Sequence, residues 1–95
     1  MIQINGTSIE LEGPVTLESF CQLRELAKPH IGQAESDWTV DWKNVKEVDS
    51  TALALIFAWQ RESAIHGKRT RNIHLPPNLK SLAELYGISD LILAA

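Results

Sequence analysis

The sequence has little cysteine and no long apolar run, and each shortage excludes a class of protein. Its single cysteine, Cys21, cannot form an intramolecular disulfide, which agrees with a reducing compartment. The longest apolar run, Ala52 to Trp59, is too short to span a bilayer, so we expect no direct membrane insertion. Residues 1–6 lack the basic start and long apolar stretch of a signal peptide. These features predict a cytoplasmic protein.

The sequence also lacks the patterns that carry most chemistry. A net charge of −3 gives no basic footprint for nucleic acid, and the cationic stretch Lys68-Arg69-Thr70-Arg71 is typical of a solvated connector. No phosphate-binding glycine loop is present. The three histidines and the carboxylates show no metal-ligand spacing. Cys21 lies in no catalytic signature, and small thiols within helices are more often core filler than nucleophiles. We therefore expect no enzyme activity, no metal and no cofactor.

With 95 residues, 44% of them apolar, the chain fits one domain over residues 1–95 with one modest core. Alternating apolar residues predict two strands, at residues 2–4 and 8–12, joined by an Asn5-Gly6 turn. Thr16 is predicted to begin a helix that ends near Pro29 and Gly32. One group of residues forms its predicted buried face: Phe20, Leu23, Ala27 and Ile31.

The second half continues the alternation of strands and helices. Residues 38–42 predict a strand, and Asp49-Ser50 is expected to cap a helix that ends before Gly67. A short strand at residues 71–75 and a last helix from about Asn78 follow. The last helix is expected to bury a stripe of four residues, namely Leu79, Leu82, Ala83 and Tyr86, and an apolar tail from residue 88 to pack back on the sheet. The order β-β-α-β-α-β-α predicts a small α/β domain with a mixed sheet of four to five strands, covered by three to four helices.

The junction Asp49-Ser50-Thr51 is the part of the sequence that points to a function. Small polar residues stand here at a helix N-terminus, where free amides and a partial positive charge tolerate an anion. The helix that follows is apolar all round for more than two turns, which is more than one buried face requires. Two interpretations are open: an N-cap before a central core helix, or a partner-docking surface on which Trp59 stays partly exposed.

The stretch from Val40 to Leu55, with its V-D strand, its V-D loop end and the S-T-A-L helix start, resembles the signature of STAS domains, the anti-sigma-factor-antagonist fold. The His66-Gly67-Lys68 turn and residues 78–88 are similar to the second half of that family. Within it, the resemblance is greatest to the MlaB-type STAS subunit of the bacterial lipid-asymmetry ABC transporter. That resemblance implies a non-catalytic cytoplasmic subunit that binds and supports the transporter ATPase, peripheral to the inner membrane, in phospholipid traffic.

The resemblance also assigns site residues. Ser50 falls on the threonine that the transporter subunit uses at its ATPase contact, and Thr51 on the serine that sporulation-type antagonists offer to a kinase. Both subfamilies prefer glycine at Ala52, where a methyl group is expected to narrow a partner's approach and so to favour constitutive docking over phosphorylation. The expected partner-binding residues are Asp49, Ser50, Thr51, Ala52, Leu55 and Trp59.

The alternative is an anti-sigma factor antagonist that a cognate anti-sigma factor kinase switches by phosphorylating Thr51 or Ser50. A phosphoryl group there adds about −2 of charge beside Asp49 and repels an acidic or apolar partner. Catalysis is the weakest hypothesis, because no nucleophile, general base and oxyanion donor are placed together by the sequence.

Overall fold

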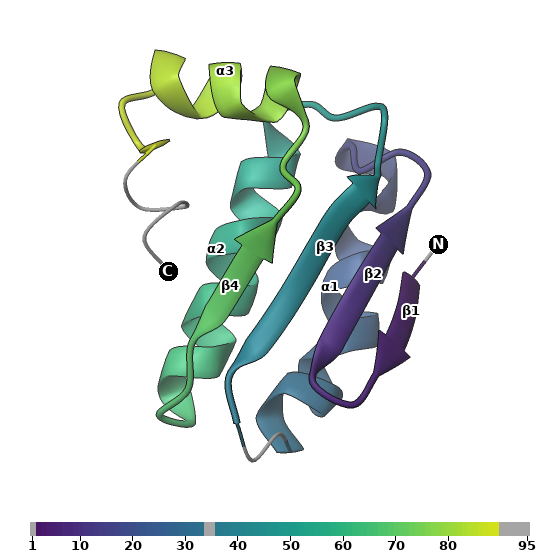
Figure 1. Cartoon of the computed structure of the whole chain (residues 1–95), viewed down its shortest axis with the longest axis vertical. Helices are drawn as coiled ribbons and strands as arrows, with labels where there is room; N and C mark the ends of the chain where they lie inside the picture. The colour runs from purple at the N-terminus through teal and green to yellow at the C-terminus, as the bar shows by residue number, and fades with distance from the viewer. Residues whose placement is uncertain (1, 34–35, 90–95) are drawn as a thin grey trace.

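The computed structural model describes residues 2–33 and 36–89. It contains seven elements: β1 (Ile2–Asn5), β2 (Ser8–Glu12), α1 (Leu17–Gln33), β3 (Trp38–Asn44), α2 (Thr51–Ile65), β4 (Thr70–Ile73) and α3 (Pro77–Leu85). Their order and the mixed character of the sheet confirm the predicted fold class, with four strands and three helices in the described residues (Figure 1).

The four strands lie in the order in which the chain makes them, β1-β2-β3-β4. Strands β1 and β2 are antiparallel, and Asn5 pairs with Ser8 across a two-residue turn of Gly6 and Thr7. Gly6 has φ +57, a left-handed conformation that glycine adopts without a steric cost. The other two pairs, β2–β3 and β3–β4, are parallel. The predicted hairpin is therefore confirmed, with its turn centred one residue later than expected.

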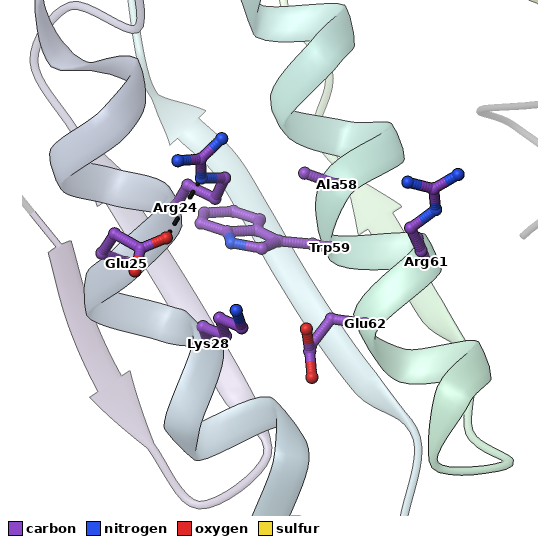
Figure 2. A pocket seen from close by; sticks show the side chains of 7 residues that line it. All are labelled: Arg24, Glu25, Lys28, Ala58, Trp59, Arg61 and Glu62. Atoms are coloured by element: carbon purple, nitrogen blue, oxygen red, sulfur yellow. Dashed lines mark hydrogen bonds and ion pairs between the residues drawn. The ribbon is translucent and has the colours of Figure 1, made fainter.

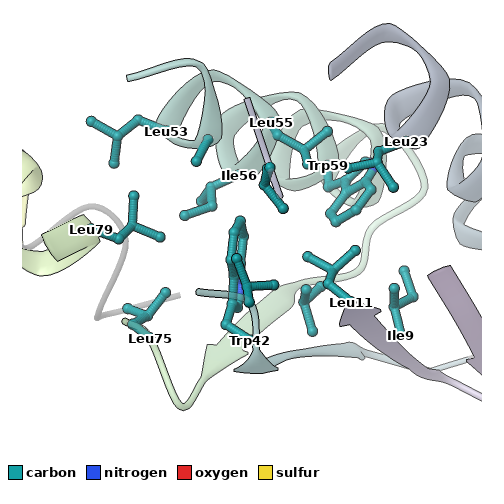
Figure 3. Packing of buried hydrophobic residues seen from close by; sticks show 14 of the residues in the cluster. Ile9, Leu11, Leu23, Trp42, Leu53, Leu55, Ile56, Trp59, Leu75 and Leu79 are labelled. Carbon is teal, nitrogen blue, oxygen red and sulfur yellow. The ribbon is translucent and has the colours of Figure 1, made fainter. Parts of the chain in front are cut away.

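Helices α1 and α2 lie side by side on one face of the sheet, and α3 lies across the end at which the parallel strands finish (Figure 1). The core fills the space between these layers. Alternation in β3 buries Trp38, Val40 and Trp42 on the helix side, and β2 buries Ile9 and Leu11 beside them. Figure 3 shows Ile9, Leu11 and Trp42 of these strands facing the apolar side chains of α2. Within residues 2–33 and 36–89, no helix covers the opposite face of the sheet.

Helix α1 contains a proline close to its end. The helix continues through Pro29 and ends at Gln33, one residue past the Gly32 at which the sequence placed its end. Pro29 removes one backbone N–H, which leaves the carbonyl of Glu25 without its helical donor. Both residues are exposed, so water can satisfy that carbonyl. Three of the four predicted face residues are buried, and Phe20 is partly buried against the core.

The region after β4 also differs from the prediction. The strand ends at Ile73 because His74 adopts a left-handed φ of 56, which interrupts the extended backbone. Leu75 is still buried, although it lies outside the strand. In α3, Tyr86 was expected in the buried stripe and is 57% exposed, since the helix ends at Leu85. Ile88 packs against the core, and the rest of the predicted apolar tail, residues 90–95, lies outside the described residues.

Candidate docking site

The β3–α2 loop and the β2–α1 connection run side by side, so α1 and α2 begin at the same end of the molecule. Val15 and Val48 form an isolated parallel bridge. The Val15 amide donates to the carbonyl of Glu47 (2.9 Å), and the Asp49 amide donates to the carbonyl of Val15 (3.4 Å). These bonds place the predicted junction next to the first turn of α1, at residue Leu17.

The carboxylate of Asp49 joins the starts of both helices. Its Oδ1 accepts hydrogen bonds from the amide and the hydroxyl of Thr51, the amide at 2.9 Å. Its Oδ2 accepts the Leu17 amide at 3.0 Å. The hydroxyl of Thr51 and these two amides hold the pKa of Asp49 below its usual value, against a smaller opposing effect of burial. Asp49 therefore carries a negative charge at two helix N-termini, where that charge is stabilising.

Of the two expected capping side chains, Asp49 performs the role and Ser50 does not. Ser50 has helical dihedrals, φ −63 and ψ −19, and its side chain makes no capping hydrogen bond. Ser50 is exposed, whereas Thr51 is half-buried with its hydroxyl bonded to Asp49. The junction thus presents one accessible hydroxyl, that of Ser50, beside one that is already engaged.

Three of the expected site residues lie inside the core. Ala52 and Leu55 have no exposed surface, and Trp59 is 1% exposed, so the prediction that Trp59 stays partly exposed is wrong. The physical reason is that α2 packs on the sheet and on α1 at once, which buries two of its faces. The methyl group of Ala52 also faces the interior and does not narrow the approach of a partner from outside.

Sequence reasoning missed two surface residues at this end. Leu17 is 71% exposed beside Asp49, and Ala54 is exposed one turn after Ser50. A leucine in the first turn of a helix was the available signal, but its place next to the junction follows from the Val15–Val48 bridge. We define the docking surface as Leu17, Asp49, Ser50, Thr51 and Ala54. It combines a small apolar area with one accessible hydroxyl.

A second polar cluster lies at the end of β3 and β4. Asp41 is 8% exposed, and its Oδ1 accepts the Lys43 amide at 2.9 Å and lies 3.0 Å from His74 Nδ1. Burial alone raises the pKa of this carboxyl, but these hydrogen bonds and the nearby charges outweigh it, so the pKa falls below its usual value. The cluster holds β4 against β3 where His74 ends the strand.

The described residues give little support to catalytic or metal chemistry elsewhere. Cys21 is exposed and is therefore not core filler. Over residues 2–33 and 36–89, no three His, Cys, Asp or Glu side chains gather as metal ligands would. No helix in the same two ranges is both long and apolar enough to cross a membrane.

Comparison with known proteins places the chain in a family. The family model described as "Mlab, STAS domain" matches residues 2–94. The chain is similar to the anti-sigma factor antagonist SpoIIAA in its unphosphorylated form, with 18% identity, 90% of this chain and 81% of that chain covered, and a TM-score of 0.68. The phosphorylated form of the Bacillus cell fate determinant SpoIIAA gives 19% identity, 93% and 83% coverage, and a TM-score of 0.67.

A Thermotoga maritima protein assigned as an anti-sigma factor antagonist has 10% identity, 98% of this chain and 82% of that chain covered, and a TM-score of 0.78. At these identities the likeness shows the fold alone. No curated relative matches the sequence. Because the family model spans nearly the whole sequence, the chain belongs to the STAS domain family.

Proposed function

We propose that this chain is a non-catalytic STAS subunit that binds the ATPase of an ABC transporter for phospholipid traffic and outer-membrane lipid asymmetry. In this proposal the chain lies in the cytoplasm and reaches the inner membrane through its partner. It holds no cofactor, and the ATP chemistry belongs to the ATPase. The description of the matching family model as "Mlab" supports this choice of partner.

The observation that carries the proposal is the state of the docking surface. The Asp49 carboxylate and the Thr51 hydroxyl already have hydrogen-bond partners within the domain, so their burial against a partner leaves few polar groups unsatisfied. Ser50 offers one accessible hydroxyl, and Leu17 and Ala54 supply apolar contact beside it. A small, pre-ordered surface of this kind suits constitutive docking, since little side-chain conformational freedom is lost on binding.

The second candidate function is a phosphorylation-switched anti-sigma factor antagonist. The exposed hydroxyl of Ser50 at the start of α2 is the observation that favours it. Phosphate on Ser50 would gain from the helix N-terminus, although it would stand beside the Asp49 charge. Phosphate on Thr51 would break the hydroxyl bond to Asp49. Ser50 is therefore the better acceptor if a kinase acts here, and phosphate at neither position in protein from growing and stressed cells, measured by mass spectrometry, would contradict this candidate.

Size-exclusion chromatography with light scattering tests the docking proposal. We expect the chain to co-elute with the transporter ATPase, and Ser50→Arg to abolish co-elution because the new side chain stands on the docking surface. Gln3→Arg is the matched control, since Gln3 is exposed on the sheet face opposite the helices. Separate elution of the wild-type chain and the ATPase would contradict the proposal. Unchanged co-elution of Ser50→Arg would place the contact elsewhere.

A further inference from the structure

The seam between α1 and α2 holds a groove that the docking surface does not include. Figure 2 shows the groove, with side chains of α1 on one side and side chains of α2 on the other. The residues that line it include Arg24, Glu25, Lys28, Trp59, Arg61 and Glu62. Ser50 and Trp59 are both placed by α2, so the groove and the docking surface share one rigid element.

The groove carries a surplus of positive charge in an acidic chain. Three basic side chains and two acidic ones line it, a formal balance of +1, while the chain as a whole is −3. Glu25 is paired with Arg24 at 3.1 Å, and Glu62 Oε2 lies 3.3 Å from His66 Nε2. Across the two described ranges, Lys28 and Arg61 have no ion-pair partner. The contact between Glu62 and His66 is an ion pair only when the imidazole is protonated, so Glu62 is counted as one negative charge. The positive charges of Lys28 and Arg61 outnumber it, and the net charge of the groove is positive.

A buried donor in the groove wall lacks an acceptor. Trp59 is 1% exposed, and its Nε1 has no hydrogen-bond partner in the described residues. The indole extends from α2 toward α1, with Arg24 beside the ring and the nitrogen on the ring edge that faces Lys28 and Glu62 (Figure 2). Trp38 Nε1 and Asn72 Nδ2 also lack a partner in the described residues, but of these three nitrogens only that of Trp59 belongs to a residue that lines this groove. An unsatisfied buried N–H costs about 1–3 kcal/mol. An acceptor that enters the groove would remove this cost.

We propose that this groove binds a carboxylate side chain from an acidic segment of the partner protein. This inference rests on the proposed docking function and names a second point of contact for it. Trp59 Nε1–H, the Arg24 guanidinium and the Lys28 ammonium supply the donors. Lys28 is exposed, so its ammonium can turn toward the entering group. Arg24 stays over the Phe20 ring, 5.3 Å from its centroid, and keeps further guanidinium N–H donors besides the one that binds Glu25.

A titration of the isolated chain with the peptide Ac-Glu-Glu-Glu-Glu-NH2, followed by the indole N–H resonances in NMR, tests the groove directly. Trp59→Phe assigns the Trp59 resonance among the three tryptophans. We expect a saturable shift of that resonance with the glutamate peptide and none with Ac-Gln-Gln-Gln-Gln-NH2. The double variant Arg24→Gln, Lys28→Gln should bind the peptide more weakly by about tenfold or more, because charge-assisted hydrogen bonds are lost.

Two results would overturn the inference. One is a Trp59 resonance that the glutamate peptide leaves unshifted, including the case in which only inorganic phosphate moves it. The other is equal peptide affinity in the wild-type chain and the Arg24→Gln, Lys28→Gln variant. The control variant Arg71→Gln, Lys80→Gln removes the same charge from exposed sites on β4 and α3 and should bind the peptide as the wild type does.

The same variants separate this inference from the docking proposal. If the wild-type chain co-elutes with the ATPase, Arg24→Gln, Lys28→Gln should weaken that complex about tenfold or more, and unchanged affinity would contradict the groove while docking stands. If the wild-type chain fails to bind the ATPase, the docking proposal fails. The peptide titration then still decides whether the groove binds carboxylates.

Discussion

At the scale of single residues, Asp49 has the largest structural role in the candidate site. One carboxylate satisfies free amides at the starts of two helices, Leu17 in α1 and Thr51 in α2. The sequence predicted a cap at Asp49 or Ser50 and a functional part for Thr51. It did not predict the bond to Leu17, because that bond spans 32 positions and depends on the bridge between Val15 and Val48.

Replacement of Asp49 tests this role. We expect Asp49→Ala to lower the free energy of unfolding by about 2–3 kcal/mol, since a cap and a charge-assisted hydrogen bond are lost together. Asp49→Asn keeps one acceptor oxygen and should cost less, about 1 kcal/mol. Urea unfolding at neutral pH measures both. A loss below about 0.5 kcal/mol for Asp49→Ala, which is usual for surface substitutions, would contradict the dual cap.

The pH dependence of the free energy of unfolding, compared between the wild type and Asp49→Ala, tests whether the ionised carboxylate stabilises the fold. The pKa of Asp49 is lower in the folded chain than its usual value. The contribution of the Asp49 carboxylate to folding stability is therefore fully present above the unfolded pKa, about 3.9. That contribution is lost as the pH falls through the lower, folded pKa. The stability gap between wild type and Asp49→Ala should therefore narrow below about pH 4. A gap that stays constant down to pH 3 would show that ionisation of Asp49 plays no part.

At the scale of elements, α2 explains why part of the site prediction failed. Periodicity and the S-T-A-L start were enough to locate the helix. They indicated more apolar surface than one buried face needs, and the structure places that surplus against α1 rather than in solvent. Whether Leu55 and Trp59 face a neighbouring helix or a partner depends on how α1 and α2, which residues 34–50 separate, pack together, and no local pattern contains that information.

Core substitution in α2 separates structure from docking. We expect Leu55→Ala to cost about 2–5 kcal/mol of unfolding free energy, because it removes a buried side chain and leaves a cavity. Ala54→Ser, one position away and exposed, should change stability by less than about 0.5 kcal/mol. Thermal and urea unfolding compare the two variants. A small effect of Leu55→Ala would indicate that Leu55 is exposed and available to a partner, as the sequence-based site had it.

At the scale of the whole molecule, local sequence patterns predicted the architecture better than its ends. Alternation, Gly6 and the helix signals were sufficient for the element order and the mixed sheet, since each signal lies within the element it defines. The exposure of Tyr86 was missed. It depends on where the last helix ends, and the spacing of apolar residues does not encode that point.

The molecule as a whole presents two different faces. Both long helices cover one face of the sheet (Figure 1), and their N-termini meet at Asp49. The opposite face carries polar residues such as Gln3 and Thr39. The central claim is that the end at which α1 and α2 begin is the surface that docks. A contact there should leave the polar sheet face accessible in the complex.

Hydrogen–deuterium exchange of the chain, alone and in complex with the transporter ATPase, tests this claim most directly. The account predicts slower exchange on binding in residues 17–20 and 50–55, where the first turns of α1 and α2 carry the docking surface. It predicts little change in β1 and β4. Protection confined to the sheet strands, with the first turns of both helices unchanged, would contradict docking through this end of the molecule.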